Sequence, residues 1–332
     1  MRTFTRKIRI PMSKHVVITG SAGFIGSHLT LALLAKGYRV TGIDNLSYGS
    51  ARKMASFSEQ QRFTFIEADA ARIEDLILAP VDLIIHLASE KIPRYSSGLE
   101  TAENNLKTAD AVIRFALSKH ARVYFASTSD VYGKNTQVPF QEESDCVFGS
   151  SLNKRWVYAG SKYMTELKLA AAARSKGLEF QIMRFFGCYG PGMNPGWRSG
   201  PQQVFFESAF ADKAPEIHGD GKQSRVYVFI DDLIRGILQL IEHDGDLNEI
   251  WNFCPSGDEE ISVLHLAEKI YALVKPACGF DPVYVPYASF GDYEDVMRRV
   301  GNAEKALKKL GWKTETSLQE GLELTYQWMM RR

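Results

Sequence analysis

A tyrosine and a lysine spaced four residues apart form the first pattern in the chain that could do chemistry. Tyr158 and Lys162 lie in "YAGSKYMTELKLAAAARSKG", a stretch of strong helical character. This spacing places both side chains on one face of a helix. A neighbouring ammonium favours the tyrosinate, so the pattern predicts a phenol whose pKa falls from about 10 toward neutrality. Such a phenol can act as a general base.

A polar cluster at the end of an apolar run supplies the second half of this candidate site. In "VYFASTSDVYG", residues 123–133, the run ends in hydroxyl groups, a carboxylate and a tyrosine. If the run is a parallel strand, its carboxyl end is where ligands bind in an open α/β sheet. Thr128 is the candidate for a hydrogen bond to a substrate hydroxyl, with Ser129 and Asp130 beside it. Asp130 has a second interpretation as a surface carboxylate that ends a strand.

A glycine-punctuated turn near the N-terminus predicts a dinucleotide site. In "GSAGFIG", Gly20 can form a tight turn, Gly23 lets a pyrophosphate approach the backbone, and Gly26 lets a helix pack closely on a strand. Asp44 ends the next apolar run, where a carboxylate suits the ribose hydroxyls of NAD and repels the extra phosphate of NADP. Asp69 ends the third run and is a candidate either for the adenine or for a helix N-cap. The other candidate cofactor contacts are Phe24, Ile25, Asn45, Ala70, Leu87, Ala88 and Ser89, together with Tyr158 and Lys162.

Short apolar runs alternate with helical patterns, and this alternation predicts a parallel sheet covered by helices on both faces. The predicted fold class is α/β: a Rossmann-type doubly wound parallel sheet with a smaller mixed α/β C-terminal domain. We expect a flexible leader over 1–14, a mainly dinucleotide-binding domain over 15–190 and a mainly substrate-binding domain over 191–332, with some exchange of strands and helices between the two. The predicted strands are 15–20, 38–44, 63–69, 81–89, 121–128 and 179–187, and the predicted later helices are 231–243, 262–275, 302–310 and 317–330.

Composition argues against several other classes of protein. The 332 residues carry 40 basic and 39 acidic side chains, so no net field attracts nucleic acid or an anionic membrane. No apolar run is long enough to span a membrane, and the N-terminal stretch lacks the apolar core of a signal peptide, which predicts a cytoplasmic protein. The four cysteines form no CxxC or Cys/His cluster, so neither a metal site nor a disulfide framework is indicated.

The order of these motifs resembles the extended short-chain dehydrogenase/reductase family, which contains NAD-dependent nucleotide-sugar epimerases, dehydratases and decarboxylases. The resemblance implies bound NAD and a nucleoside-diphosphate sugar as substrate, with a UDP-sugar expected from the commonest relatives. It also implies transient oxidation at sugar C4, in which Tyr158 is the base, Lys162 bridges the cofactor ribose and the tyrosine, and Thr128 contacts the C4 hydroxyl. The matching stretches, from about residue 15 to 328, are "VVITGSAGFIGSHL", "GIDNLS", "HLAS", "STSDVYG", "YAGSK", "RFFGCYGPG", "GDGKQSRVYVFIDD" and "KALKKLGW".

The reaction that follows this oxidation depends on Asp130. The family's 4-epimerases tend to have a neutral residue there, and its TDP-glucose dehydratases have two successive acids, the first of which is replaced by Ser129 in this chain. The nearest pattern is the Ser-Thr-Ser-Glu of UDP-glucuronate decarboxylases, so decarboxylation of UDP-glucuronate is the leading hypothesis. The alternatives are 4-epimerisation of a UDP-hexose or UDP-hexuronate, 4,6-dehydration of a nucleotide sugar, and a non-catalytic NAD-binding regulator.

Four basic residues are candidate substrate contacts. The resemblance implies that Arg225, in "GDGKQSRVYVF", contacts the diphosphate, because a guanidinium group pairs bidentately with phosphate oxygens. Arg299 is the candidate for a second substrate contact, with Arg298 as the alternative register. Lys91 and Arg94, in "SEKIPRYSS", would suit a hexuronate carboxylate, and a solvated charged loop is the other interpretation of this segment.

The resemblance also implies a homodimer, formed through helices predicted at 100–118 and 158–175. Ala111, Ile113, Leu167 and Ala171 are the apolar candidates for the interface. The same stripes could instead pack on the sheet.

Overall fold

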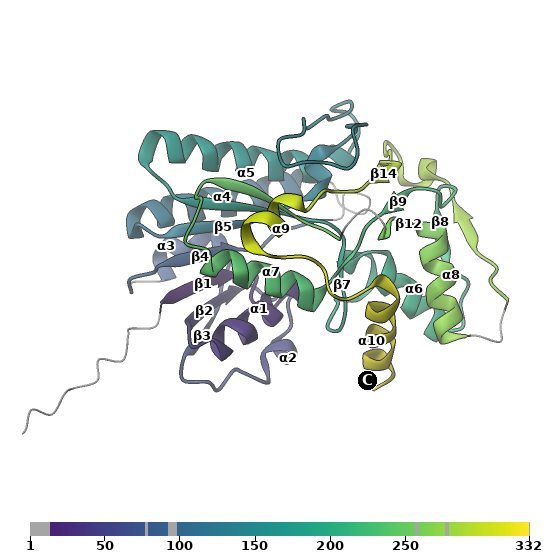
Figure 1. Ribbon diagram of the computed structural model, residues 1–332, viewed down its shortest axis with the longest axis horizontal. Coiled ribbons are helices and arrows are strands. Elements are labelled where there is room, and N and C mark those ends of the chain that lie inside the picture. The colour runs from purple at the N-terminus through teal and green to yellow at the C-terminus, as the bar shows by residue number, and fades with distance from the viewer. Residues whose placement is uncertain (1–13, 77–78, 92–97, 256–258, 276–278, 332) are drawn as a thin grey trace, which may run out of the picture.

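A sheet of seven parallel strands organises the fold, as the strand pattern predicted. The computed structural model describes residues 14–76, 79–91, 98–255, 259–275 and 279–331. The strands lie in the order β11-β6-β5-β4-β1-β2-β3, with helices on both faces (Figure 1). The Rossmann-type fold is therefore confirmed. The strands are β1 (His15–Thr19), β2 (Arg39–Asp44), β3 (Phe63–Glu67), β4 (Leu83–His86), β5 (Arg122–Thr128), β6 (Phe180–Phe185) and β11 (Glu249–Phe253).

Two cores, one on each face of the sheet, explain why the strands are almost continuously apolar. Val16 and Ile18 of β1 pack with α1 (Phe24–Ala35) and α7 (Ile230–Glu242). Val17, which points the other way, packs with α4 (Leu99–Lys119) and α5 (Arg155–Lys176). Alternate residues of one strand thus enter different cores, and both must be apolar.

Residues beyond 190 contribute to both parts of the fold. Within the large sheet, β11 extends the edge beside β6, and α7 and α9 (Glu304–Leu310) pack nearby. The smaller part contains α6 (Pro201–Phe210), α8 (Val263–Val274) and α10 (Leu318–Met330). It also holds a three-stranded sheet of β12 (Ile261–Ser262), β9 (Ser224–Arg225) and β14 (Arg298–Arg299). In that sheet Arg299 lies directly opposite Arg225, so the fold brings two predicted substrate contacts together.

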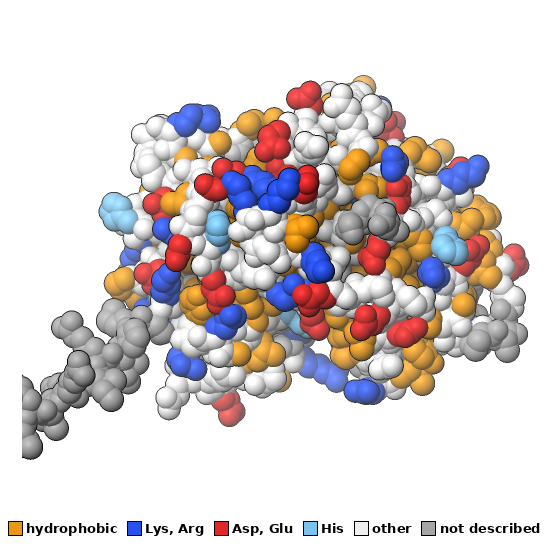
Figure 2. Space-filling model, viewed as in Figure 1, with side chains coloured by type: hydrophobic (Ala, Val, Ile, Leu, Met, Phe, Trp, Pro, Cys, Tyr) orange, Lys and Arg blue, Asp and Glu red, His pale blue; other side chains and the backbone are white. Residues whose placement is uncertain are grey.

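The surface carries no dominant field on the face shown in Figure 2, where basic and acidic side chains are intermixed. None of the helices among the described residues is long and apolar enough to cross a membrane.

The apolar positions expected at a dimer interface divide into two groups. Ala111 is 1% exposed and packs in the core between α4 and the sheet, and Ile113 packs partly against the same core. Ala111 was therefore the wrong choice, because its side chain faces the sheet. Leu167 and Ala171 of α5 are exposed, and Leu167 retains 45% of its surface.

Candidate active site

A cavity of about 550 Å³ lies at the carboxyl edge of the large sheet and extends to the smaller part of the chain. Its volume is in the range of small-ligand sites. All described residues predicted to contact cofactor or substrate line it, and Arg94 lies outside the described residues. These lining residues are Gly20, Gly23, Phe24, Ile25, Gly26, Asp44, Asn45, Asp69, Ala70, Leu87, Ala88, Ser89, Lys91, Thr128, Ser129, Asp130, Tyr158, Lys162, Arg225 and Arg299.

The glycine turn after β1 has the geometry of a phosphate cradle. Gly20 has φ +78°, a conformation that favours glycine. A Cβ on Gly26 would lie 2.1 Å from the Gly20 carbonyl oxygen, so only glycine lets α1 pack this closely on the turn. Gly23 is the N-cap of α1 and lines the cavity. The turn therefore leaves backbone room, and the amides at a helix N-terminus, for a pyrophosphate.

Two carboxylates lie at the ends of β2 and β3, beside this cradle. Asp44 accepts hydrogen bonds from the Ala22 N–H (3.0 Å) and the Leu46 N–H (2.9 Å), and burial raises the pKa of its carboxyl group. Asp69 accepts a hydrogen bond from the Ala71 N–H (2.9 Å) and is therefore the N-cap of a short 3-10 helix. It also lines the cavity. The cradle and the fixed carboxylate fit a dinucleotide with free ribose hydroxyls. The described residues contain no group of three or more His, Cys, Asp or Glu side chains that could hold a metal ion.

Asp44 gives a direct test of cofactor choice. We expect the wild-type chain to bind NAD more tightly than NADP. In Asp44→Asn, the ratio of the dissociation constant for NADP to that for NAD should fall about tenfold, because the substitution removes the charge that repels the 2′-phosphate. Calorimetric titration of both cofactors measures the ratio. Asp82→Asn is the matched control, since Asp82 accepts from the His15 N–H (2.7 Å) at the opposite edge of the sheet. If the ratio of the two dissociation constants were unchanged in Asp44→Asn, Asp44 would not be a contact of the cofactor ribose.

Lys162 is fixed by the strand beside it. The side chain is 3% exposed, and its ammonium group donates a hydrogen bond to the Ala126 carbonyl of β5 (2.8 Å). It also lies 4.7 Å from the centre of the Phe125 ring. Burial lowers the pKa of Lys162 to about 7, although Glu166 raises it. The bond to β5 therefore fixes Lys162 one helical turn beyond Tyr158.

The phenol of Tyr158 differs from the expectation drawn from its spacing. Burial, followed by Asp130, raises the pKa of Tyr158. Hydrogen bonds with Thr128 and Ser89, and the charge of Arg299, act in the opposite direction without reversing the shift. The predicted lowering of this pKa is thus wrong for the chain alone, because burial and the charge of Asp130 outweigh the groups that lower it. Its role as a base requires further positive charge in the cavity.

Asp130 lies in a network of ion pairs that links three arginines. Its carboxylate pairs with Arg299 and, at 3.0 Å, with Arg155. Arg155 also pairs with Asp295 at 2.9 Å, and Asp295 pairs with Arg225 at 3.0 Å. The side chains of Arg155 and Asp295 are 8% and 2% exposed, so the centre of the network is buried. We call these five residues the arginine network.

The arginine network decides the ionisation of Asp130. Burial disfavours the charged carboxylate, but Arg299 and then Arg155 outweigh it and hold the pKa of Asp130 below its usual value. The interpretation of Asp130 as a surface carboxylate is therefore wrong. The two residues before Asp130 are held in the structure as well. The Thr128 hydroxyl accepts a hydrogen bond from the Asp130 N–H (3.2 Å), and Ser129 is buried, with 2% of its surface exposed.

Arg155 and Asp295 were missed by sequence reasoning. Arg155 had one available signal, because it lies three residues before Tyr158 on the same helix and so shares its face. Asp295 had none, since it is 140 residues from Arg155 in the chain and only the fold brings them together.

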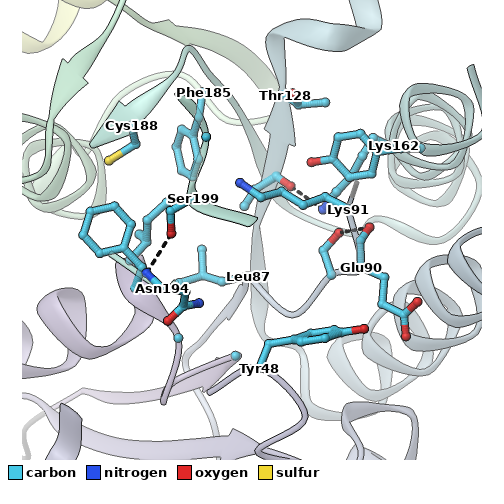
Figure 3. A pocket seen from close by; sticks show the side chains of 18 of the residues that line it. Tyr48, Leu87, Glu90, Lys91, Thr128, Lys162, Phe185, Cys188, Asn194 and Ser199 are labelled. Atoms are coloured by element: carbon cyan, nitrogen blue, oxygen red, sulfur yellow. Dashed lines mark hydrogen bonds between the residues drawn. The ribbon is translucent and has the colours of Figure 1, made fainter. Parts of the chain in front are cut away.

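Lys91 extends into the cavity, as Figure 3 shows. Its amine points toward Phe185 and Cys188, while Thr128 and Lys162 lie on the other side. Burial by the surrounding protein lowers the pKa of the amine, although the side chain itself is exposed. Lys91 thus lines a ligand-sized space, where a substrate contact was expected.

Comparisons with known proteins agree with this geometry. A model of the NAD dependent epimerase/dehydratase family matches residues 16–254. The chain belongs to this family. A UDP-N-acetyl-alpha-D-glucosaminuronate decarboxylase of Bacillus cytotoxicus is 29% identical over 96% of this chain and 98% of its own length. The UDP-glucuronic acid decarboxylase 1 of Arabidopsis thaliana is 30% identical over 92% of this chain and 68% of its own.

Solved structures of the epimerase/dehydratase family share the whole fold. The UDP-glucose 4-epimerase of Thermotoga maritima, solved with UDP-glucose, has a TM-score of 0.83 at 28% identity and covers 96% of this chain and 99% of its own. A dTDP-glucose 4,6-dehydratase of Streptomyces venezuelae, solved with NAD, has a TM-score of 0.84 at 26% identity and covers 96% and 97%. The chain is thus an enzyme of the NAD-dependent epimerase/dehydratase type, and the hypothesis of a non-catalytic regulator does not stand.

Proposed function

We propose that this enzyme decarboxylates a nucleoside-diphosphate hexuronate, with UDP-glucuronate as the leading substrate. The position of Lys91 in the cavity carries the proposal. A nucleotide diphosphate diester has two negative charges and a hexuronate adds a third, and Lys91, which lies outside the arginine network, is the cation that the hexuronate carboxylate would meet. The two relatives named as decarboxylases carry UDP-hexuronates in their names. The charged side chains lining this part of the cavity include the cations Lys91, Arg155, Arg225 and Arg299 and the carboxylates Asp130 and Asp295.

NAD is the proposed cofactor. The glycine turn would hold its pyrophosphate and Asp44 its adenosine ribose. When bound, NAD would supply a hydride acceptor for sugar C4, a positively charged ring, and the same hydride for return to the sugar. The residues that line its cradle need supply no redox chemistry of their own.

Proton transfer at C4 is the task of the chain's own residues. Tyr158 would take the proton of the C4 hydroxyl, and Thr128, which shares a hydrogen bond with Tyr158, would orient that hydroxyl. Lys162 would stabilise the phenolate formed. Because burial raises the pKa of Tyr158, this step depends on positive charge brought close to the phenol by Lys162 and the cofactor.

Loss of carbon dioxide then follows from the ketone at C4. The bond between C5 and its carboxylate breaks, the electron pair moves into an enolate on the C4 oxygen, and C5 afterwards takes one proton. No dedicated base is required. Asp130, held ionised by Arg155 and Arg299, cannot donate a proton to a leaving hydroxyl, which disfavours 4,6-dehydration. Epimerisation at C4 is the second candidate, because it shares the first step and because a UDP-glucose 4-epimerase has the same fold.

The substrate class can be tested by thermal denaturation followed by a product assay. With NAD present, UDP-glucuronate should raise the melting temperature more than UDP-glucose does, because Lys91 would pair with the carboxylate. Lys91→Met should remove most of the difference between the two sugars. The wild-type enzyme should also release carbon dioxide from UDP-glucuronate. Binding without carbon dioxide release, beside an inverted C4, would establish the epimerase instead.

We also propose a homodimer formed through α4 and α5. Met164 and Leu167 lie one turn apart on α5 and are 46% and 45% exposed, and Ala171 continues the same stripe. Leu167→Glu should shift the sedimentation coefficient to that of the monomer. A wild-type chain that sediments as a monomer would remove the proposal.

A further inference from the structure

A buried ion pair lies beside the face of α5 that carries Tyr158 and Lys162. Glu166 follows Lys162 by one turn of the helix, and its carboxylate accepts two hydrogen bonds from the Arg184 guanidinium of β6 (2.6 and 3.1 Å). The side chains of Glu166 and Arg184 are 4% and 3% exposed, and neither lines the cavity. Any effect of this pair on a bound substrate therefore passes through the residues that it contacts.

The Glu166–Arg184 pair contacts both ends of segment 128–130, which lines the cavity. Before the segment, the Ser127 hydroxyl donates a hydrogen bond to the Glu166 carboxylate (2.5 Å). After it, the centre of the Tyr132 ring lies 4.7 Å from the Arg184 guanidinium, a cation–π contact. Ser127 and Tyr132 are both buried. One buried ion pair thus holds the segment in place from two sides.

Two side chains of α5 are bound to consecutive residues of β5. Lys162 donates to the Ala126 carbonyl (2.8 Å), and Glu166 accepts from the hydroxyl of Ser127, the next residue of the strand. A single bond would leave the helix free to shift along the strand, whereas two bonds one turn apart fix its register. The position of Tyr158, one turn before Lys162, is therefore set relative to the end of β5.

We infer that Glu166, oriented by Arg184, is a positioning residue that holds the phenol of Tyr158 against Thr128 for proton transfer from the C4 hydroxyl. The inference deepens the proposed function and rests on it for the role of Tyr158. It does not depend on which reaction follows, because oxidation at C4 is the first step of both decarboxylation and epimerisation.

Ser127→Ala in the full chain removes the hydrogen bond to Glu166 and leaves the ion pair intact. We expect kcat to fall about tenfold, because a small misplacement of the phenol slows proton transfer. KM for the sugar nucleotide should stay within about twofold of the wild type, since the Ser127 hydroxyl donates to Glu166 and not to the substrate. The Tyr158→Phe chain completes a double-mutant cycle with this variant.

The cycle separates positioning from a general loss of folded enzyme. In the Tyr158→Phe background, Ser127→Ala should change the remaining kcat by less than about twofold, because the phenol that Ser127 helps to position is absent. A loss of folded enzyme would lower kcat by the same factor in both backgrounds. Turnover of UDP-glucuronate gives the four values, and inversion of UDP-glucose gives them if no carbon dioxide is released.

Two further variants test the carboxylate itself and the specificity of the effect. Glu166→Gln should lower kcat at least as much as Ser127→Ala and should also lower the melting temperature, because Arg184 loses its charged partner in a buried site. Thr325→Val is the matched control for Ser127→Ala. Thr325 is fully buried and donates to the Gly321 carbonyl of α10 (2.7 Å), away from the cavity, so its loss should leave kcat within about twofold.

The inference is overturned if Ser127→Ala has the kcat of the wild type, if its main effect is on KM, or if it lowers kcat equally in both backgrounds. Each of these results leaves the proposed function standing as long as Tyr158→Phe is inactive. A Tyr158→Phe chain with wild-type kcat would instead contradict the proposed proton transfer, and the role of Glu166 would fall with it.

Discussion

Replacing Tyr158 by phenylalanine should lower kcat by about 10²–10⁴-fold and leave NAD bound, because the change removes the group that exchanges a proton with the C4 hydroxyl and little else. The phenol lies in the cavity within hydrogen-bonding reach of Thr128. Turnover of UDP-glucuronate gives kcat, and calorimetric titration gives the dissociation constant for NAD.

A second tyrosine on the same helix serves as the control for Tyr158. Tyr163 packs against Phe148, with ring centres 5.8 Å apart, and does not line the cavity. Tyr163→Phe should therefore keep kcat within about twofold of the wild type. Equal kcat values for Tyr158→Phe and Tyr163→Phe would remove Tyr158 from the mechanism.

Replacing Arg155 by methionine should lower the free energy of unfolding by about 3 kcal/mol, the lower end of the cost of breaking a buried ion pair. The cost arises because Asp130 and Asp295 each lose one of their partners in a buried setting. Each keeps another arginine, which limits the loss. UDP binding should also weaken, because Arg225 and Arg299 are oriented through these two carboxylates.

Two further variants separate the effects of Arg155→Met. Arg114→Met should lower the free energy of unfolding by less than about 1 kcal/mol, since Arg114 pairs with Glu74 at the surface. Adding Asp295→Asn to Arg155→Met should lower the stability further, because buried Arg225 then loses the carboxylate with which it pairs. Urea denaturation measures the free energy of unfolding, and calorimetry measures UDP binding. If Arg155→Met were as stable as the wild type, the arginine network would not be a buried structural unit.

Local patterns in the sequence were enough to predict the fold and most of the candidate site. Gly20, Gly23 and Gly26 form a cradle within seven residues, and Tyr158 and Lys162 share one helix face, so neighbours in the chain define both features. The glycine turn and the Tyr158–Lys162 pair lie at the same edge of the sheet because the carboxyl ends of parallel strands lie together.

The rest of the site depends on contacts between distant segments. The pairing of Asp130 with Arg299 is set by where the small sheet meets the end of β5, and no local pattern encodes it. The direction of the Tyr158 pKa failed for the same reason, since burial and Asp130 outweigh the spacing to Lys162.

The most direct test of transient oxidation followed by decarboxylation is one incubation of the wild-type enzyme and NAD with UDP-glucuronate that carries deuterium at C4. We predict release of carbon dioxide and a UDP-pentose that retains the deuterium at C4, with no net reduction of NAD. A product of unchanged mass, or loss of the deuterium from the sugar, would contradict the account.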